Sequence, residues 1–582
     1  MFKRITRFKV GNKVYEYVRI VENYREKGKR HQRVIANLGT VESLPGKIDK
    51  LVDGLREYCR QKFVKPGEIK GEESLTWGTV LVARKLWNDL GLSEIIRRNC
   101  AKGKESEIEE SAFVLVASSF VNPSSEHGLS WWLDKSFVCD SKGRRFLPQW
   151  KDNVTKENRV RVEWSQLQMW YRTLDRLLKV KKEIEKDIYL NLRNLFGLKV
   201  DIVFYDITSL YFEGEGPEGL AEFGKSKDGK NRNKQILLGV VMASGWPVAH
   251  HVFSGNTSEK TTLSGIIDDL KQRFEIERIV FVSDSGFVSE ENLKYITNTG
   301  YKYLVAMKRR RSKEVEKVLK EVKETGWQDC ANHTEVQEIK MKKEEQKGPR
   351  YFVARSEERK QYEQAIRINN MKTTREALEA LKKRTEKGKI KTPEKIGYNA
   401  SSILNKVKGY RYFSWKITKE GKFEYWEDPE KMKKEKLIEG TYLLKSNEET
   451  IKSVEAVKTY KQLSDVEGAF REFKDVLEGR PIWHQTEKRV RAHTFVRALG
   501  YLLDTALRKA LERNNVYLTV EEAIESLKQI TIADLRLRGE THQIVMGINK
   551  RYARSVLNAV GLDNKYLLPS QVGSYTGNNR VN

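Results

Sequence analysis

Two short apolar runs that each lead into an aspartate constrain the fold of this chain more than any other feature. The first runs from Asp201 to Asp206, and the second runs from Arg278 to Gly286 and contains Asp284. Uninterrupted β-branched and aromatic residues are typical of strands that are buried on both faces of a sheet. In open α/β sheets, ligands bind at the carboxyl ends of such strands. We therefore predict that Asp206 and Asp284 lie at one rim of a sheet and hold a metal ion, although a single aspartate there more often begins a turn.

The elements between these runs predict a mixed sheet. Gln235–Met242 and Trp246–Phe253 alternate as two antiparallel strands, and the helical segment Thr257–Phe274 leads back to the second run. Three strands, a helix and a fourth strand in this order predict an α/β ribonuclease-H-like fold. His250 and His251 point to opposite faces of their strand, so at most one could reach a metal site, and we interpret both as structural.

The charge of the chain indicates a polyanionic partner. The 582 residues carry a formal net charge of +28 at pH 7, an excess that favours nucleic acid over an acidic protein or a membrane surface. The length predicts about three or four domains. No apolar run is long enough for a membrane span, and no secretory signal follows Met1. Widely spaced cysteines without a C-x-x-C motif favour a reducing, cytoplasmic location with nucleoid association: Cys59, Cys100, Cys139 and Cys330.

The N-terminal third of the chain is predicted to bind DNA. Tyr15–Val21 and Gln32–Ala36 form a basic β-hairpin, and helical periodicity follows over Leu75–Asp134 and Trp164–Phe196. Such helices are equally consistent with a packed bundle alone. Basic residues in this region support DNA binding: Arg84, Lys85, Arg97, Arg98, Lys102 and Lys104.

A change in composition after Ala306 indicates an insertion into the sheet domain. Lysine and glutamate dominate the following residues, and two aromatic strands, Tyr410–Ile417 and Lys422–Trp426, are predicted to form a hairpin before the core resumes at Gly440. Trp415 and Trp426 are candidates to stack on an unpaired DNA base. For either residue alone, packing within the insertion's own small core is the commoner role of such rings.

A helical stripe in the C-terminal half supplies a third carboxylate. Spacings of mainly three or four residues place these side chains on one helix face: Tyr460, Leu463, Glu467, Phe470, Arg471 and Lys474. By itself the stripe is better explained by an ion pair on a packed surface. Together with Asp206 and Asp284, however, Glu467 completes three carboxylates from two strands and a helix, which suits a two-metal phosphoryl-transfer site. Arg471 and Lys474 are then candidates for DNA phosphate contacts.

These motifs resemble those of bacterial insertion-sequence transposases of the DDE type, within the insertion-sequence-four superfamily and most like the branch typified by insertion sequence 1634. That superfamily carries a signature of Tyr, two residues, Arg, three residues, Glu, six residues and Lys. Tyr460, Glu467 and Lys474 match it in register, whereas Leu463 stands where the signature has arginine. Further similarity lies in four short motifs: Phe204–Thr208, Gly224–Lys227, Gly255–Thr257 and Val282–Gly286.

The resemblance implies a DNA transposase that cleaves insertion-sequence ends and joins them to target DNA by a cut-and-paste route through a hairpin. It implies two Mg²⁺ ions, with Mn²⁺ able to substitute, held by the catalytic residues Asp206, Asp284 and Glu467. It also implies double-stranded DNA partners, namely the inverted-repeat ends and the target, and a synaptic homodimer. Two alternatives remain open at this stage: a related metal-dependent nuclease, and an inactive DNA-binding regulator derived from a transposase.

The predicted organisation combines these assignments into a ribonuclease-H-like mixed-sheet catalytic core that is interrupted by a β-rich insertion. A basic hairpin unit with a linker (1–70) precedes a helical DNA-binding region (71–195). The core is split into 196–307 and 438–510 by the insertion at 308–437. A C-terminal helical region and tail (511–582) complete the chain.

Overall fold

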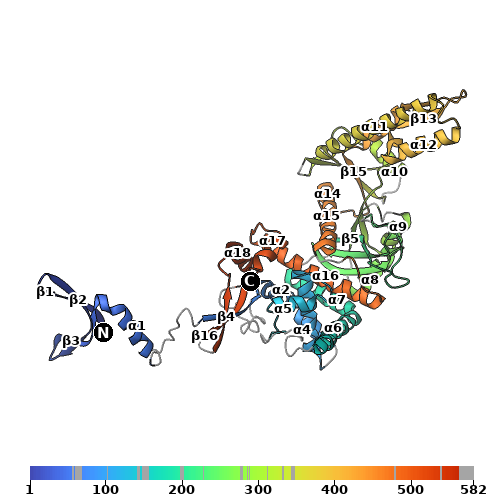
Figure 1. Cartoon of the computed structure of the whole chain (residues 1–582). Helices are drawn as coiled ribbons and strands as arrows, with labels where there is room; N and C mark the ends of the chain where they lie inside the picture. The colour runs from blue at the N-terminus through green and yellow to red at the C-terminus, as the bar shows by residue number, and fades with distance from the viewer. Residues whose placement is uncertain are drawn as a thin grey trace. The chain divides into compact units, whose positions relative to one another are not determined.

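The computed structural model describes residues 1–55, 58, 69–100, 103–140, 145–146, 156–196, 202–226, 229–274, 279–284, 286, 289–310, 312–330, 333–341, 348–476, 480–537 and 540–562. They belong to two compact units, Met1–Ser74 with Ile532–Ile544, and Leu75–Thr531 with Val545–Asn582 (Figure 1). No helix in these ranges is long and apolar enough to cross a membrane.

The first unit begins with a three-stranded antiparallel sheet in the order β1-β2-β3. Its strands are β1 (Phe2–Val10), β2 (Lys13–Glu26) and β3 (Lys29–Thr40). The tight turn between β2 and β3 uses positive φ at Lys27 and Gly28, as two-residue hairpins require. The predicted hairpin is therefore confirmed, but β1 was not predicted from the sequence. The 3₁₀ turn η1 (Val41–Ser43) and helix α1 (Leu44–Leu55) follow.

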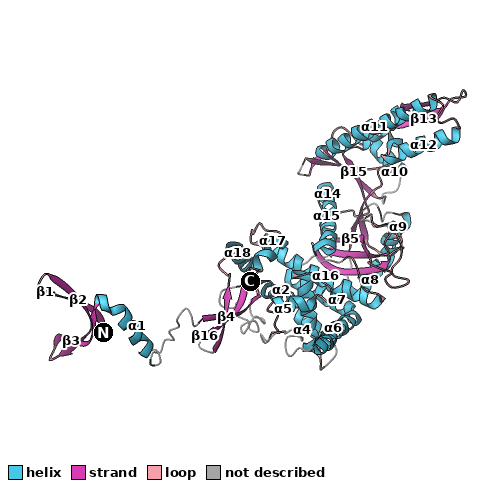
Figure 2. Cartoon of the chain, in the orientation of Figure 1, coloured by secondary structure: helices cyan, strands magenta, loops and turns pink. Residues whose placement is uncertain are grey.

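A second three-stranded sheet joins distant parts of the chain in the order β17-β16-β4. It contains β4 (Ile69–Thr76), β16 (Thr531–Leu537) and β17 (Glu540–Met546), shown as strands in Figure 2. The region after residue 511 was expected to be helical. It does contain α17 (Val520–Leu527) and α18 (Arg551–Ala559), but β16 and β17 between them are an addition to that expectation.

The second unit opens with a helical layer that packs around a long C-terminal helix, α16 (Glu487–Arg513), which contacts α2, α4 and α6. The helices of this layer are α2 (Gly78–Asp89), α3 (Leu92–Asn99), α4 (Glu105–Val121), α5 (Leu129–Lys135), α6 (Lys156–Lys179) and α7 (Lys181–Phe196). Arg84 is 3% exposed and pairs with the buried Glu109 at 3.1 Å. Arg84 therefore cannot contact DNA here, and the prediction that it supports DNA binding is wrong.

A nine-stranded mixed sheet forms the centre of the second unit, in the order β10-β11-β12-β15-β9-β8-β5-β6-β7. Its pairs are antiparallel except β5 with β8 and β8 with β9. The strands are β5 (Ile202–Tyr211), β6 (Gln235–Ala243), β7 (Trp246–Ser254), β8 (Val280–Ser283), β9 (Lys302–Ala306), β10 (Gln328–Asp329), β11 (Thr334–Ile339), β12 (Arg350–Ser356) and β15 (Thr441–Ser446). The predicted ribonuclease-H-like order of three antiparallel strands, a helix and a parallel strand is present.

Helices cover both faces of this sheet, which explains why its central strands read as continuous apolar runs. Along β6, Leu238 packs into one core with residues of α15 (Leu463–Arg471) and α16. Its neighbour Leu237 packs into the other core with residues of α8 (Glu259–Phe274) and α9 (Glu290–Asn298). Successive strand residues alternate between the two faces of a sheet. When both faces are buried, apolar residues therefore occupy successive positions instead of alternating with polar ones.

The insertion has a small core of its own beyond the strands that it adds to the sheet. It contains α10 (Lys313–Lys320), α11 (Glu357–Glu386), α12 (Pro393–Lys406), the 3₁₀ turn η5 (Gly409–Arg411), β13 (Phe413–Ile417), β14 (Phe423–Glu427) and α13 (Pro429–Ile438). The predicted aromatic hairpin is confirmed, with Trp415 opposite Tyr425. Leu378, Phe413 and Phe423 lie in its buried core.

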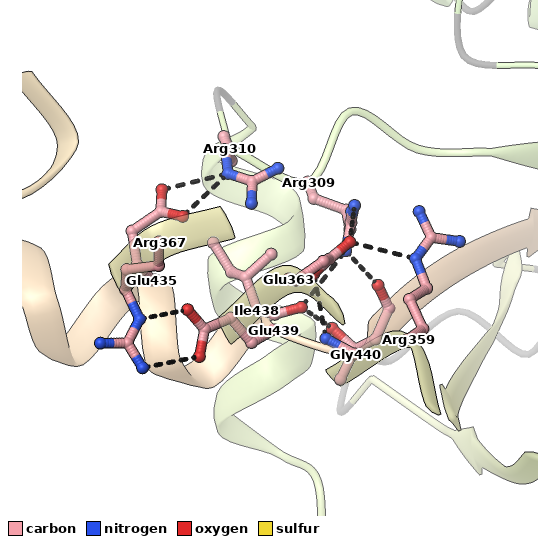
Figure 3. A network of polar contacts seen from close by, with 10 residues as sticks. Arg309, Arg310, Arg359, Glu363, Arg367, Glu435, Ile438, Glu439 and Gly440 are labelled. Atoms are coloured by element: carbon pink, nitrogen blue, oxygen red, sulfur yellow. Dashed lines mark hydrogen bonds and ion pairs between the residues drawn. The ribbon is translucent and has the colours of Figure 1, made fainter. Parts of the chain in front are cut away.

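A network of ion pairs holds the base of the insertion (Figure 3). Arg309 pairs with Glu363 of α11 at 2.9 Å and donates to the carbonyl of Thr441 at 2.6 Å. The Gly440 amide donates to Glu363 at 3.0 Å. Burial alone would raise the pKa of Glu363, but these hydrogen bonds lower it to about 2. The start of α11 is therefore fixed to the point where the chain re-enters the sheet.

A second polar network joins the helical layer to β7. Nδ1 of the buried His250 lies 2.9 Å from Glu185 of α7, and Arg273 of α8 pairs with the same carboxylate. Burial lowers the pKa of His250 to about 4 and that of His251 to about 3. Both histidines thus have structural roles, as interpreted from the sequence.

We expect this network to make the protein less stable in mild acid. Both histidines are neutral in the folded chain, whereas an unfolded histidine takes up a proton below about pH 6.5. Their contribution to stability is present above that pH and is lost as the pH falls towards 4. His250→Gln should lower the melting temperature at pH 7.5 and flatten its fall between pH 7.5 and 5, while the exposed His127→Gln should change neither. An equal pH slope in His250→Gln and wild type would contradict this account.

Candidate metal-dependent active site

The parallel pairing of β5 and β8 brings two aspartates together. Ile202 lies opposite Val280 and Phe204 opposite Val282, so the same register places Asp206 opposite Asp284, one residue beyond the end of β8. Both aspartates are half-buried. Asp206 was predicted to end its strand, but β5 continues to Tyr211. The rim of the sheet beside Asp206 is formed because β8 ends at Ser283, whereas β5 continues past it.

A glycine and a fourth carboxylate flank Asp284. The Gly286 amide donates to Oδ1 of Asp284 at 2.7 Å. A Cβ at residue 286 would lie 2.9 Å from that Oδ1 and 2.9 Å from Oε2 of Glu259, so the two carboxylates need glycine here. Glu259 was not predicted as a site residue. Its only signal was an acidic side chain two residues after the Gly255–Thr257 motif.

The third predicted carboxylate lies on α15, which packs against β5. Leu463, Val466 and Phe470 of this helix are buried in the core between helix and sheet. Glu467 is exposed. The helix is therefore fixed by its apolar side chains while the carboxylate of Glu467 stays accessible to a ligand.

The charges of the three predicted carboxylates all affect the pKa of Tyr460. Tyr460 lies on α14 (Ser453–Lys461), and its ring centre is 6.0 Å from that of Tyr442 on β15. Burial raises the pKa of Tyr460 to about 12, and the charges of Asp284, Glu467 and Asp206 contribute in the same direction. The structure thus pairs Asp206 with Asp284 and packs the helix of Glu467 against β5, and metal binding by these residues stays a prediction.

This donor set fits divalent cations that prefer oxygen ligands. Carboxylates from β5, the end of β8 and α15 are hard ligands of the kind that Mg²⁺ and Mn²⁺ take. In the described part of the chain, these carboxylates do not form a group of three with all ligand atoms within 4.8 Å.

The remaining predicted contacts differ in their exposure. Arg471, at the end of α15, is exposed, whereas Lys474, in the following π-helical turn η6 (Glu472–Val476), is only 8% exposed. Trp415 packs partly into the insertion core, with its ring centre 6.0 Å from that of Phe423. Trp426 is 42% exposed. Trp426 is thus the more accessible of the two tryptophans, and the DNA contacts of all four residues stay predictions.

A separate cluster of Glu126, His484 and His493 has ligand atoms within 4.8 Å of one another. The carboxylate lies 3.1 Å from Nδ1 of His493 and 3.4 Å from Nε2 of His484. Arg497 donates to the other ring nitrogen of His493 at 3.4 Å, so the ring proton lies on Nδ1 and is donated to Glu126. Burial alone would raise the pKa of Glu126, but hydrogen bonds from His484 and His493 hold it well below its usual value. We interpret this cluster as a hydrogen-bonded link between the α4–α5 connection and α16.

Comparisons with known proteins identify two family regions. Residues 2–67 match the N-terminal domain of the IS1634 family transposases, and residues 199–503 match the transposase DDE domain. The second match covers more than half of the chain and contains Asp206, Asp284, Tyr460 and Glu467.

No curated protein matches the chain significantly. Among solved structures, the cryo-EM structure of the piggyBac transposase synaptic complex with hairpin DNA is similar, at 11% identity and a TM-score of 0.36, over 86% of each chain. Similarity at this level supports no conclusion about mechanism.

We predict that Gly286→Ala weakens divalent-metal binding without unfolding the protein. The added methyl group must displace the carboxylate of Asp284 or of Glu259, because its nearest atoms would lie at 2.9 Å. Isothermal titration with Mn²⁺ should show lower affinity at an unchanged melting temperature. Gly265→Ala on α8 is the matched control, since nothing lies within 4 Å of its added methyl group. Wild-type Mn²⁺ affinity in Gly286→Ala would contradict the assigned geometry.

Proposed function

Since the chain belongs to the DDE transposases of the IS1634 type, we propose that it cleaves the ends of its insertion sequence and joins the freed 3′-hydroxyls to target DNA. Membership of this family makes the chain a DNA-binding transposase that depends on divalent metal. The observation that carries the finer proposal is the register that places Asp206 opposite Asp284, with the helix of Glu467 packed against β5. The intact carboxylate set favours an active enzyme over a regulator that only binds DNA.

The carboxylates have distinct roles in this proposal. Asp206, which lies in mid-strand beside Asp284, would hold two Mg²⁺ ions together with Asp284 and Glu467. Mn²⁺ would fit the same oxygen ligands. When bound, such ions activate the attacking oxygen and stabilise the charge that develops on the phosphate.

The proposed reaction is a series of phosphoryl transfers. Water attacks the phosphorus at the end of the element, and the 3′-oxygen of the cleaved strand leaves and is protonated. That 3′-hydroxyl next loses its proton and attacks the opposite strand to close a hairpin. After the hairpin is hydrolysed, the 3′-hydroxyl attacks target DNA, with one bond to phosphorus formed and one broken in each step.

Other predicted residues would position the DNA. Arg471, and Lys474 after a rearrangement that exposes it, would contact phosphates next to the site, and Tyr460 would pack beside the reacting strand. Trp426, and Trp415 to a smaller extent, would stack on a base that leaves the duplex at the hairpin. Two copies of the chain would hold the paired ends in a synaptic homodimer.

We expect Asp206→Asn, Asp284→Asn and Glu467→Gln each to abolish Mg²⁺-dependent cleavage of end DNA and to leave DNA binding intact. Each change removes one ligand charge but keeps the side-chain shape. Cleavage of a labelled linear end and binding in Ca²⁺ should be measured for each variant. Glu291→Gln, an exposed carboxylate on α9, is the control. Wild-type cleavage by any of the three variants would remove that residue from the site, and strand transfer to a target plasmid separates a transposase from a simple nuclease.

The N-terminal sheet is expected to provide salt-sensitive DNA contacts. Lys9→Ala combined with Lys13→Ala, both exposed at the β1–β2 turn, should lower the slope of log affinity against log salt by about 1 to 2. The full chain is needed for this measurement, because α4 and α6 pack against α16 and a fragment of residues 1–195 would lack that helix. Lys271→Ala with Lys294→Ala on α8 and α9 is the control. Equal slopes for the two double variants would place the contacts elsewhere.

A further inference from the structure

The insertion brings an arginine to the edge of the carboxylate site. Arg359 lies in the first turn of α11, three residues after β12 ends. Its guanidinium carbon is 5.9 Å from the ring centre of Tyr442, and the ring centre of Tyr442 is 6.0 Å from that of Tyr460. The charge of Arg359 opposes the effect of the three carboxylates on the pKa of Tyr460. Arg359 is thus separated from Tyr460 by one ring, that of Tyr442.

Neighbouring groups hold this arginine in place while leaving part of it accessible. Its Nε donates to Glu363 at 3.1 Å, and Glu363 is itself fixed by Arg309 and the Gly440 amide (Figure 3). The side chain of Arg359 is 47% exposed. Within the described residues, its two Nη groups have no hydrogen-bond partner. A fixed guanidinium with free Nη groups is suited to bind a phosphate through two hydrogen bonds.

Two positions on the helix of Glu467 are less well placed to contact DNA beside Tyr460. Leu463 occupies the position where the resembled signature has arginine, and it is 5% exposed in the core beneath α15. No DNA contact can come from that position. Arg471 is exposed at the far end of α15, eleven residues beyond Tyr460. On α14, Lys458 and Lys461 are exposed, and Lys461 donates to Thr334 at 2.9 Å. Arg359 adds a basic group on the Tyr460 side from the insertion.

We propose that Arg359 binds a backbone phosphate of the DNA strand held at Asp206, Asp284 and Glu467, so that the insertion completes the substrate site. This inference rests on the proposed function, because it requires DNA at the carboxylates. Arg359 is a DNA-positioning residue in this arrangement, and Glu363 orients it.

The test combines variants of the full chain with end DNA that carries a neutral methylphosphonate at one phosphate at a time, near the cleavage position. Binding is measured in Ca²⁺ by fluorescence anisotropy. Arg359→Gln should weaken binding of unmodified DNA by about 10-fold. It should cause no further loss on DNA whose neutral position is the contacted phosphate. Arg359→Lys should recover part of the affinity, because it keeps the charge but not the paired donors.

Arg375→Gln is the matched control. Arg375 lies on the same helix and is 53% exposed, but it pairs with Glu427 of the β13–β14 hairpin instead of lying beside Tyr442. If Arg359 only stabilises the insertion base, Arg359→Gln lowers the melting temperature and its effect adds to that of the neutral phosphate at every position. That result, or binding equal to that of Arg375→Gln, would overturn the proposal.

The binding experiment separates this inference from the proposed function. Additive losses at every phosphate, in a wild-type chain that cleaves end DNA with Mg²⁺, would remove Arg359 from the site and leave the transposition mechanism standing. Absence of Mg²⁺-dependent cleavage by wild type would overturn the mechanism alone, because the binding cycle in Ca²⁺ does not depend on cleavage.

Discussion

The pairing of β5 with β8 is the constraint on which the rest of the site depends. Its parallel register sets Asp206 beside Asp284, and a shift by one residue would turn Asp206 to the opposite face. Burial by α8 and α9 on one face and by α15 and α16 on the other fixes that register. Two carboxylates held side by side repel each other, so their arrangement is costly without a cation and suits a site that binds one.

The insertion and the catalytic helix are coupled through the same sheet. The insertion begins after β9 and ends before β15, which pair with each other, so it begins and ends at adjacent strands. From β15 the chain continues into α14 and α15, which carry Tyr460 and Glu467. Arg309 pairs with Glu363 of α11 and donates to the carbonyl of Thr441, so it holds α11 to the start of β15. The base of the insertion and the third carboxylate therefore share one rigid support.

Buried polar networks link the helical layer to this support. Glu185 joins α7 to β7 and α8 through His250 and Arg273, and Glu126 joins the α4–α5 connection to α16 through His493. Each carboxylate is buried and balanced by neighbouring cations or donors, because an unpaired buried charge would be strongly destabilising. These links explain why His250 and His493 stabilise the fold, whereas Asp206 and Asp284 belong to the candidate active site.

The sequence by itself determined the elements whose signal is local. Alternation predicted β6, β7 and the β13–β14 hairpin, and the two apolar runs identified Asp206 and Asp284. Helical spacing predicted one helix from Tyr460 to Lys474, which the structure divides among α14, α15 and η6. Only the tertiary structure decided that β5 extends past Asp206, that Arg84 and Lys474 are buried, and that β16 and β17 pair with β4. It also brought Glu259 and Arg359 to the site. These outcomes depend on contacts between residues far apart in the chain, and neither burial nor proximity of that kind leaves a periodic pattern in the residues around each side chain.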